Sequence, residues 1–402
     1  MQLTRRAARW LERRALLRRG AFDPGAERAW LARAVRLRPD HAPALRALAR
    51  WHQLRGEREA ARALWLRAAE AAPRHPEAPA QLAWLSLWLG ETDGARAWAE
   101  LALAAAPAPG RPFAEWRQMR SLLDHLALAD PTLRHRHVAL CGVSFCGSTL
   151  LSHMLGTAPG VANVGESHWL VHRPEPGGSV EIDFARDPYA LQPQCGACGA
   201  ACPVLTRALR ETLSAERVNW SDRIADAFGT RILVSADKNQ RKRITLDPLL
   251  RFDAVVLFKS PTEAWASEVR KGRRGRDVGA YLSLWDTEYR RLAFDLPSRG
   301  RRLFVHFDRF REDPERHLRR LCEALALPFD PAMVRGVRPD QHALGGNPRV
   351  HGALRSGAGI EVAARDEAEL PAAERATAAH YERASDLYAW LRAEHARLFA
   401  GA

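Results

Sequence analysis

The chain is poor in lysine. Lys and Arg together account for 61 of its 402 residues, but only four of these are lysines, and the arginines are spread from end to end. The formal net charge of +14 would suit a nucleic acid, a membrane surface or an acidic ligand. However, no block of like charges forms a basic tail. The distribution is typical of a compositional bias, so we expect no specific nucleic-acid partner.

Cysteine is scarce, and uninterrupted apolar runs are lacking. Six cysteines are too few for a disulfide scaffold, and the arginine-rich N-terminus lacks the apolar core of a secretory signal. The longest stretch without Asp, Glu, Lys or Arg, residues 137–165, contains five glycines and Pro159. It predicts a buried strand, a turn and a helix in place of a membrane span. With 47% hydrophobic residues, we expect a sizeable core. Because neither a secretory signal nor a disulfide scaffold is predicted, we expect the protein to be cytoplasmic.

The first third of the chain repeats at a regular interval. Pro39, Pro73 and Pro107 are evenly spaced, and small and bulky residues recur in phase with them. Small residues are needed where antiparallel helices pack closely, and proline ends the second helix of each unit. The in-phase positions are Leu31, Ala34, Ala61, Trp65, Ala68, Ala95 and Ala102.

This pattern resembles the tetratricopeptide repeat, and the interval between the prolines equals the period of that family. It predicts an all-α repeat array over residues 1–109, followed by a capping or linker helix within 110–133. The alternative is an ordinary helical bundle rich in Ala and Arg. Because such arrays commonly hold an extended peptide or another protein in a concave groove, the resemblance implies a protein or peptide partner.

A glycine-bounded loop opens the second part of the chain. Residues 137–141 read as a buried strand, residues 142–149 have the sequence GVSFCGST, and apolar residues follow at helical spacing. Strand, loop and helix N-terminus form an anion cradle of backbone N–H groups. The spacing matches the Walker loop, except that Ser148 replaces the lysine that reaches the β- and γ-phosphates, which disfavours ATP or GTP hydrolysis. The predicted phosphate-binding residues are Cys146, Gly147, Ser148, Thr149 and Leu150.

Further apolar strands are predicted at 232–234, 254–258 and 302–307, each followed by a polar segment and a helix. Strands that alternate with helices predict a parallel sheet covered on both faces. We therefore expect a three-layer, P-loop-like α/β domain over residues 134–402, with a cysteine-rich insertion near 195–202 and C-terminal helices.

The order of motifs over about residues 135–350 resembles the sulfotransferases that use 3′-phosphoadenosine 5′-phosphosulfate (PAPS). That family has a first loop near R-S-G-T-T-L-L, then a proline and G-E, then R-D-P with a serine eight residues after the arginine. A later pattern reads Y-E-D-L…D-P…L-G-L-P. The matching positions here are residues 145–151, Pro159, Gly165-Glu166, Lys259, Pro261, Ser267 and residues 307–328.

The resemblance implies transfer of a sulfuryl group from PAPS to a hydroxyl, on a protein, peptide or glycan. Lys259 and Ser267 would contact the 3′-phosphate. In tyrosylprotein sulfotransferases the G-E glutamate is the general base and a lysine after the second strand helps to stabilise the leaving group, and Glu166 and Lys238 match these positions. The alternatives are a capping or surface role for Glu166 and a solvated loop charge for Lys238. Because Phe145 stands where the family has Arg or Lys, a non-catalytic nucleotide- or protein-binding scaffold and a kinase on the same fold stay open.

Two smaller features bear on the same site. Cys146 lies at a predicted helix N-terminus, where thiolates are stabilised, and is a candidate nucleophile. Gly345-Gly-Asn347 resembles a loop that closes over the nucleotide in bacterial relatives, although a plain glycine-rich turn has the same composition.

Three cysteines form a C-x2-C-x3-C cluster in the insertion. Cys195, Cys198 and Cys202 can converge on one ion because their spacings are short, and tetrahedral zinc would then need a fourth ligand. His168 and His172 are the nearest imidazoles by sequence. We expect a zinc knuckle, and the alternative is a metal-free loop.

Overall fold

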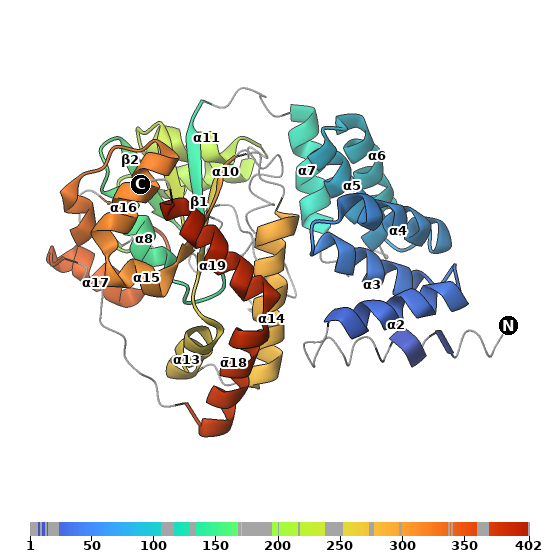
Figure 1. Ribbon diagram of the computed structural model, residues 1–402. Helices are drawn as coiled ribbons and strands as arrows, with labels where there is room; N and C mark the ends of the chain where they lie inside the picture. The colour runs from blue at the N-terminus through green and yellow to red at the C-terminus, as the bar shows by residue number, and fades with distance from the viewer. Residues whose placement is uncertain are drawn as a thin grey trace. The chain divides into compact units, whose positions relative to one another are not determined.

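The structure of the chain is a computed structural model. It describes residues 7–8, 10–12, 14, 24–105, 116–128, 134–167, 170, 195–199, 201–215, 218–237, 252–272, 277–296, 300–336, 338, 341–359 and 370–400. Figure 1 labels the helices and strands.

The chain divides into two compact units. The first contains residues 1–128, 261–297 and 368–388, and the second contains residues 129–260, 298–367 and 389–402. The sequence predicted three consecutive segments, 1–109, 110–133 and 134–402. In the structure, residues 261–297 and 368–388 pack with the helical N-terminal region instead of with the sheet.

Consecutive helices of the first unit follow the predicted repeats (Figure 1). They are α2 (Pro24–Leu37), α3 (Ala42–Gln53), α4 (Arg58–Ala71), α5 (Glu77–Leu89), α6 (Thr92–Ala104) and α7 (Trp116–Leu128). The helix pair α5 and α6 follows the pair α3 and α4 at nearly the same interval as the prolines. The helix α7 lies within the segment predicted to cap the array. The N-terminal region is thus built of tetratricopeptide-like helical repeats.

The in-phase residues form the core of the repeats. Trp65 and the small residues Ala34, Ala61, Ala68 and Ala95 are all buried. Helices α2 and α4 end shortly before Pro39 and Pro73, as expected for a residue that cannot continue a helix. The Trp65 indole N–H donates to Gln53 Oε1 at 2.7 Å, which satisfies a polar group that the core would otherwise leave unpaired.

Later segments of the chain also belong to the first unit. They form α13 (Pro261–Arg270), α14 (Val278–Arg290), the π-helical turn η1 (Arg291–Asp295) and α18 (Ala372–Ala384). Gln53 of α3 donates to Asp295 at 2.6 Å, and Arg290 forms ion pairs with Asp286 at 2.9 Å and Asp386 at 2.5 Å. The contacts Gln53–Asp295 and Arg290–Asp386 join residues that are distant in the sequence.

The second unit is built on a parallel five-stranded sheet with the order β2-β3-β1-β4-β5. The strands are β1 (Arg136–Cys141), β2 (Val161–Gly165), β3 (Ile232–Ser235), β4 (Asp253–Phe258) and β5 (Arg302–His306). Four of them were predicted, and β2 was not. Strand β1 lies in the middle, paired with β3 on one side and β4 on the other. The chain runs from β1 to β2 on one side and from β3 to β4 on the other, and ligands commonly bind at the carboxyl ends of the strands where the order reverses in this way.

Helices cover both faces of this sheet. Alternate side chains of β1, such as Val138 and Leu140, pack against α8 (Ser148–Gly156) and α16 (Pro314–Leu325). On the other face, Val164 and Leu233 pack against α10 (Arg207–Ala215) and α11 (Trp220–Ala227). The remaining elements of this unit are α15 (Phe307–Glu312), η2 (Pro331–Arg335) and α17 (Pro348–Ser356); α19 (Asp386–Phe399) begins in the first unit and ends in the second.

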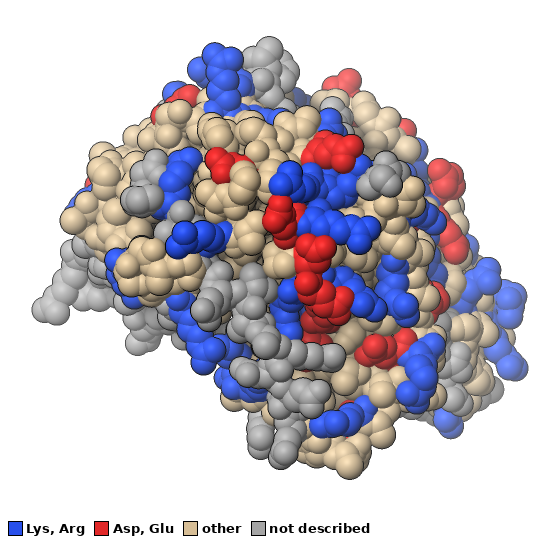
Figure 2. Space-filling model, turned by 60° about the vertical axis from the view of Figure 1, so that its left-hand side comes forward, with Lys and Arg blue, Asp and Glu red and all other residues tan. Residues whose placement is uncertain are grey.

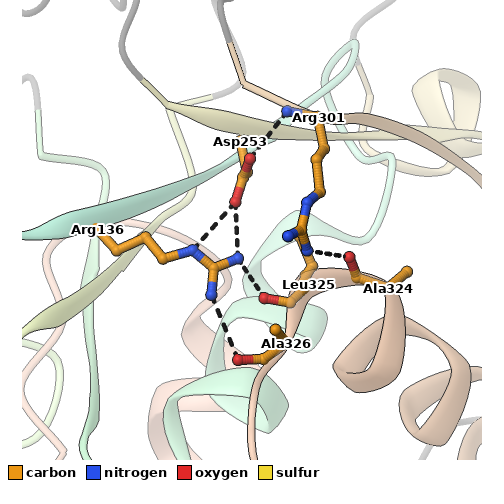
Figure 3. A network of polar contacts seen from close by, with 6 residues as sticks. All are labelled: Arg136, Asp253, Arg301, Ala324, Leu325 and Ala326. Atoms are coloured by element: carbon orange, nitrogen blue, oxygen red, sulfur yellow. Dashed lines mark hydrogen bonds and ion pairs between the residues drawn. The ribbon is translucent and has the colours of Figure 1, made fainter.

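An arginine network fastens α16 to the amino-terminal edge of the sheet (Figure 3). Arg136 of β1 donates to Asp253 of β4 at 2.8 Å, and the same guanidinium donates to the carbonyl oxygens of Leu325 and Ala326. Arg301 donates from its backbone to Asp253 at 2.8 Å and from its side chain to the carbonyl of Ala324. The last carbonyls of a helix lack intrahelical donors, so these arginines both satisfy them and complement the helix dipole.

Basic and acidic side chains lie beside one another on the surface shown in Figure 2. Ion pairs one helical turn apart are a common form of this mixing in the second unit, such as Arg319 with Glu315 at 2.6 Å and Arg309 with Glu312 at 2.8 Å. Among the helices of the described segments, none is both long and apolar enough to cross a membrane.

Candidate nucleotide site

The carboxyl ends of all five strands meet at one edge of the sheet, because the strands are parallel. This edge carries the segments that the sequence singled out. The segments that follow β1 to β5 are, in turn, the loop 142–147, Glu166, Ala236-Asp237, Lys259-Ser260 and Phe307-Asp308. Hydrogen bonds connect neighbouring segments at this edge. Ala236 N–H donates to Gly165 O at 2.7 Å, and Ser260 N–H donates to Asp308 at 3.4 Å.

The loop after β1 has a backbone that only a few residue types adopt easily. Gly142, Phe145 and Gly147 have φ values of 153°, 62° and 98°. Gly147 is the N-cap of α8, and the first helical hydrogen bond runs from Leu151 N–H to Gly147 O at 3.2 Å. The N–H groups of residues 148–150 therefore have no acceptor within the helix. Such a helix N-terminus can receive an anion, and phosphate binding by this loop stays a prediction.

Within this loop, Ser148 and Cys146 have different environments. Ser148 is 1% exposed, and its Oγ has no hydrogen-bond partner among the described residues. A buried hydroxyl without a partner is costly, so a ligand oxygen at this position would be favourable. The Cys146 side chain, in contrast, is buried in the apolar core and its N–H donates to Val143 O at 3.3 Å. This burial disfavours the role of nucleophile, and it leaves Cys146 a packing role behind the loop.

The ring of Phe307 lies against both the loop and Lys259. A Cβ on Gly147 would overlap the ring of Phe307, so the loop backbone rests directly on that ring. The Lys259 ammonium lies 5.4 Å from the centre of the same ring, within the range of a cation–π interaction. Lys259 is also 7% exposed. A buried ammonium beside the anion cradle raises the positive potential there.

Glu166 and Thr149 each lie against one residue of the segment Gly345-Gly346. A Cβ on Gly345 would lie 2.9 Å from Glu166 Oε2, and a Cβ on Gly346 would lie 2.8 Å from Thr149 Cγ2. Both glycines have positive φ values, of 58° and 103°. Glycine is required here by conformation and by space. The structure thus brings the predicted base and the predicted phosphate-binding helix to two adjacent residues. Whether Gly345-Gly346 closes over a nucleotide stays a prediction.

The buried His153 and the half-buried His351 lie close to this segment. His153 of α8 contacts Gln341 Oε1 through Nδ1 at 2.6 Å, and Gln341 donates back to the His153 carbonyl at 3.1 Å. Burial lowers the pKa of His153 to about 4, and burial likewise lowers the pKa of His351, whose ring centre lies 5.9 Å from that of His153. Both rings are therefore neutral at pH 7 and act by packing and hydrogen bonding.

Two predicted residues are outside this group. Lys238 lies outside the described residues, but its neighbour Asp237 is fully buried and accepts a hydrogen bond from Ser167. Ser267 belongs to α13 in the first unit, where Arg270 donates to its Oγ at 3.0 Å and to Glu263 at 2.7 Å. The proposed contact of Ser267 with a 3′-phosphate stays a prediction.

The three cysteines of the insertion converge, with a histidine that the sequence reasoning did not connect with them. His342 Nδ1 lies 3.9, 3.2 and 3.5 Å from the sulfurs of Cys195, Cys198 and Cys202. Partial burial and the neighbouring thiols raise the pKa of Cys198 to about 11. The predicted fourth ligands, His168 and His172, lie outside the described residues; in the described part of the chain the imidazole beside the three sulfurs is that of His342. Because the cysteine turn and His342 are far apart in the sequence, no short motif signals the pairing.

A concave region lies at the opposite edge of the sheet, with a volume of about 740 Å³. It is lined by the arginine network of Figure 3 and by His135. The polar groups there have partners within the protein: His135 pairs with Asp222 at 3.0 Å and Asp226 at 3.2 Å. It lies at the amino ends of the strands, so we assign it a structural role.

No protein-family model matches the chain, and no curated protein matches its sequence. One solved structure with some similarity is a mutant of the O-GlcNAc transferase from Thermobaculum terrenum. The two are 12% identical, the match covers 63% of this chain and 46% of the other, and the TM-score is 0.28. The match thus spans less than half of that protein's length, and a similarity this low carries no argument about function.

Proposed function

We propose that the chain transfers a sulfuryl group from PAPS to a hydroxyl group. The observation that carries the proposal is the proximity of Glu166 to Gly345 and of Thr149 to Gly346, two adjacent residues. A carboxylate and an anion cradle that share one neighbouring segment are what an in-line transfer requires, with an anionic donor on one side and an acceptor proton on the other. The lysine missing from the Walker spacing argues against a γ-phosphate donor.

In the proposed reaction the 5′-phosphosulfate lies at the N-terminus of α8. The acceptor oxygen attacks sulfur, the bond between sulfur and the bridging oxygen of the 5′-phosphate breaks, and that oxygen keeps the electron pair. Glu166 takes the acceptor proton as general base. The leaving group is 3′-phosphoadenosine 5′-phosphate (PAP), and its new negative charge is met by the N–H groups of residues 148–150 and by Lys238. Lys259 and Ser267 hold the 3′-phosphate in this proposal.

The helical repeats favour a protein or peptide acceptor. Stacked helix pairs form extended binding surfaces without chemistry of their own. In this proposal the repeats hold the acceptor or a scaffold partner, and the second unit carries out the transfer.

A second candidate function is nucleotide binding without transfer. Phe145 is half-buried and has a φ of 62°, at the position where the sulfotransferases it resembles have a cation. Without that cation the transferred group loses one source of charge stabilisation. The two functions predict the same nucleotide binding and differ in turnover.

Calorimetry with PAP, adenosine 5′-phosphosulfate and ATP tests the binding. We expect PAP to bind more tightly than adenosine 5′-phosphosulfate, which lacks the 3′-phosphate, and both to bind more tightly than ATP. Ser267→Ala should weaken PAP and leave adenosine 5′-phosphosulfate unchanged. Equal binding of ATP and PAP would favour a kinase, and the absence of any nucleotide binding would refute both candidate functions.

Transfer from ³⁵S-labelled PAPS to a peptide library tests the chemistry. Glu166→Gln should lower turnover by about 10²–10⁴-fold with PAP affinity nearly unchanged, because a general base acts mainly in the transition state. Glu211→Gln, an exposed glutamate of α10, is the matched control and should leave turnover unchanged. Full activity in Glu166→Gln would place the base elsewhere; no label transfer by the wild type, with tight PAP binding, would favour the binding function.

A further inference from the structure

We infer that Cys195, Cys198, Cys202 and His342 bind one Zn²⁺ ion, and that this ion fastens the segment 342–356 beside the nucleotide site. The zinc site itself is argued from its own geometry. Its effect on nucleotide binding rests on the proposed function.

The distances between the four side chains match tetrahedral zinc. Zn–S bonds of about 2.3 Å and Zn–N bonds of about 2.0–2.1 Å, at tetrahedral angles, place nitrogen and sulfur about 3.5 Å apart. The distances from His342 Nδ1 to the three sulfurs are 3.2, 3.5 and 3.9 Å, and all four ligand atoms lie within 4.8 Å of one another. Three sulfurs and one nitrogen form a closed ligand set with no position for water, which is typical of structural zinc and not of catalytic zinc.

The backbone around the cysteines supports a bound cation. Cys198 N–H points to Cys195 Sγ at 3.5 Å, and Leu205 N–H points to Cys202 Sγ at 3.3 Å. Such N–H donors stabilise thiolates, which are the form of cysteine that binds metal. Gly199 N–H donates to Cys195 O at 2.9 Å and closes the turn between the first two ligands. Gly199 has a φ of 65°, a conformation that glycine adopts at no steric cost.

The turn formed by residues 195–199, here called the cysteine turn, is also hydrogen-bonded to the segment that carries His342. Gly196 N–H donates to Ala343 O at 2.8 Å, and Arg355 donates to Gly196 O at 2.9 Å. Leu344 is bridged to Cys195 on one side and to Gly165 at the end of β2 on the other. Contacts with the cysteine turn therefore occur near both ends of the segment 342–356.

This segment contains the two glycines that lie against the candidate site. Glu166 N–H donates to Leu344 O at 2.8 Å, and Leu344 N–H donates to Val164 O at 2.9 Å. Gly345 then lies against the Glu166 carboxylate and Gly346 against Thr149. Only Ala343 and Leu344 separate His342 from Gly345. A metal bond at His342 thus limits how far the glycines can move from Glu166 and Thr149.

Zinc content tests the site without reference to any nucleotide. Protein purified with a reductant should contain about one zinc per chain by mass spectrometry of the metal. His342→Ala should lose it, and His342→Cys should keep it, because four thiolates also bind zinc tetrahedrally. His380→Ala, an exposed histidine of α18, is the matched control and should keep it. Wild type without zinc, or zinc unchanged in both His342→Ala and Cys198→Ser, would overturn the site.

Hydrogen exchange tests the coupling. Removing zinc from the wild type with a chelator, or by His342→Ala, should increase amide exchange over residues 343–347, and His342→Cys should restore the protection. PAP affinity should fall in step with this loss. Zinc loss with unchanged exchange over 343–347 would overturn the fastening role. Increased exchange in a protein that binds no PAP at all would support the fastening role and refute the proposed function instead.

Discussion

Asp295 is predicted to lower the stability of the chain at neutral pH. The π-helical turn η1 holds this carboxyl against α3, where it accepts a hydrogen bond from Gln53 at 2.6 Å. Burial raises its pKa from 3.8 to about 6, and the hydrogen bond from Gln53 and nearby arginines only partly oppose the rise. A difference of about two pKa units corresponds to about 3 kcal/mol, an upper limit because some solvent reaches the side chain.

Proton linkage gives the direction in which the free energy of unfolding changes with pH. Below pH 3.8 both the folded and the unfolded carboxyl are protonated, so Asp295 has no pH-dependent effect. Between pH 3.8 and about 6 the folded state binds more protons, and the free energy of unfolding falls as the pH rises. Above that range the loss is constant. The substitution Asp295→Asn removes the ionisable group and keeps an oxygen that can accept from Gln53.

Thermal unfolding of wild type and Asp295→Asn should be compared from pH 4 to pH 7.5. We expect only a small difference in melting temperature at pH 4 and a clearly higher value for the variant at pH 7, by about 2–4 °C for each kcal/mol recovered. Asp93→Asn, an exposed aspartate of α6, is the control and should change stability by less than about 0.5 kcal/mol at every pH. A difference independent of pH, or a variant less stable at pH 7, would refute the reasoning.

Three further predictions concern packing and the candidate site. Trp65→Ala should lower the free energy of unfolding by about 3–5 kcal/mol in a denaturant titration, because the indole is fully buried, whereas Trp10→Ala, at a residue that is 49% exposed, should have a small effect. Gly346→Ala should weaken PAP in calorimetry, because its Cβ would lie 2.8 Å from a methyl of Thr149 at a φ of 103°, whereas Gly352→Ala, where the Cβ meets no atom within 4 Å, should not. Phe145→Arg should speed sulfuryl transfer in the label assay by adding a cation, since both residues tolerate a φ of 62° equally poorly; slower transfer would show that the site needs the ring.

Helix and strand positions with a strong local signal could be predicted from the sequence. The helical repeats follow from evenly spaced prolines and from small residues at positions such as Ala61 and Ala95, which are fully buried in the structure. The strands β1, β3, β4 and β5 are short apolar runs next to turn residues. Strand β2, Val161–Gly165, was missed because it includes Asn163 and a glycine, and β-propensity is too weak to identify such a strand.

Some residues of the candidate site could likewise be predicted from the sequence, and others could not. Lys259 and the loop 142–149 could be found because each follows an apolar run, and parallel strands bring their carboxyl ends to one edge. Glu166 could be found only through the G-E motif of the sulfotransferases that the chain resembles, because the strand before it was missed. The pairing of Gly346 with Thr149, and the core burial of Cys146, could not be found, because they depend on how distant segments pack.

Candidate metal ligands can be recognised from local spacing, whereas the packing of distant segments sets which of them lie close together. The spacing of Cys195, Cys198 and Cys202 is a local property, so three ligands could be predicted from it. The fourth, His342, comes from a segment much further along the chain, and it reaches the cysteines because Leu344 pairs with both Cys195 and the end of β2. Local spacing limits what a short segment can form, whereas contacts between distant segments depend on the sheet order and on loop closure, which no single segment encodes.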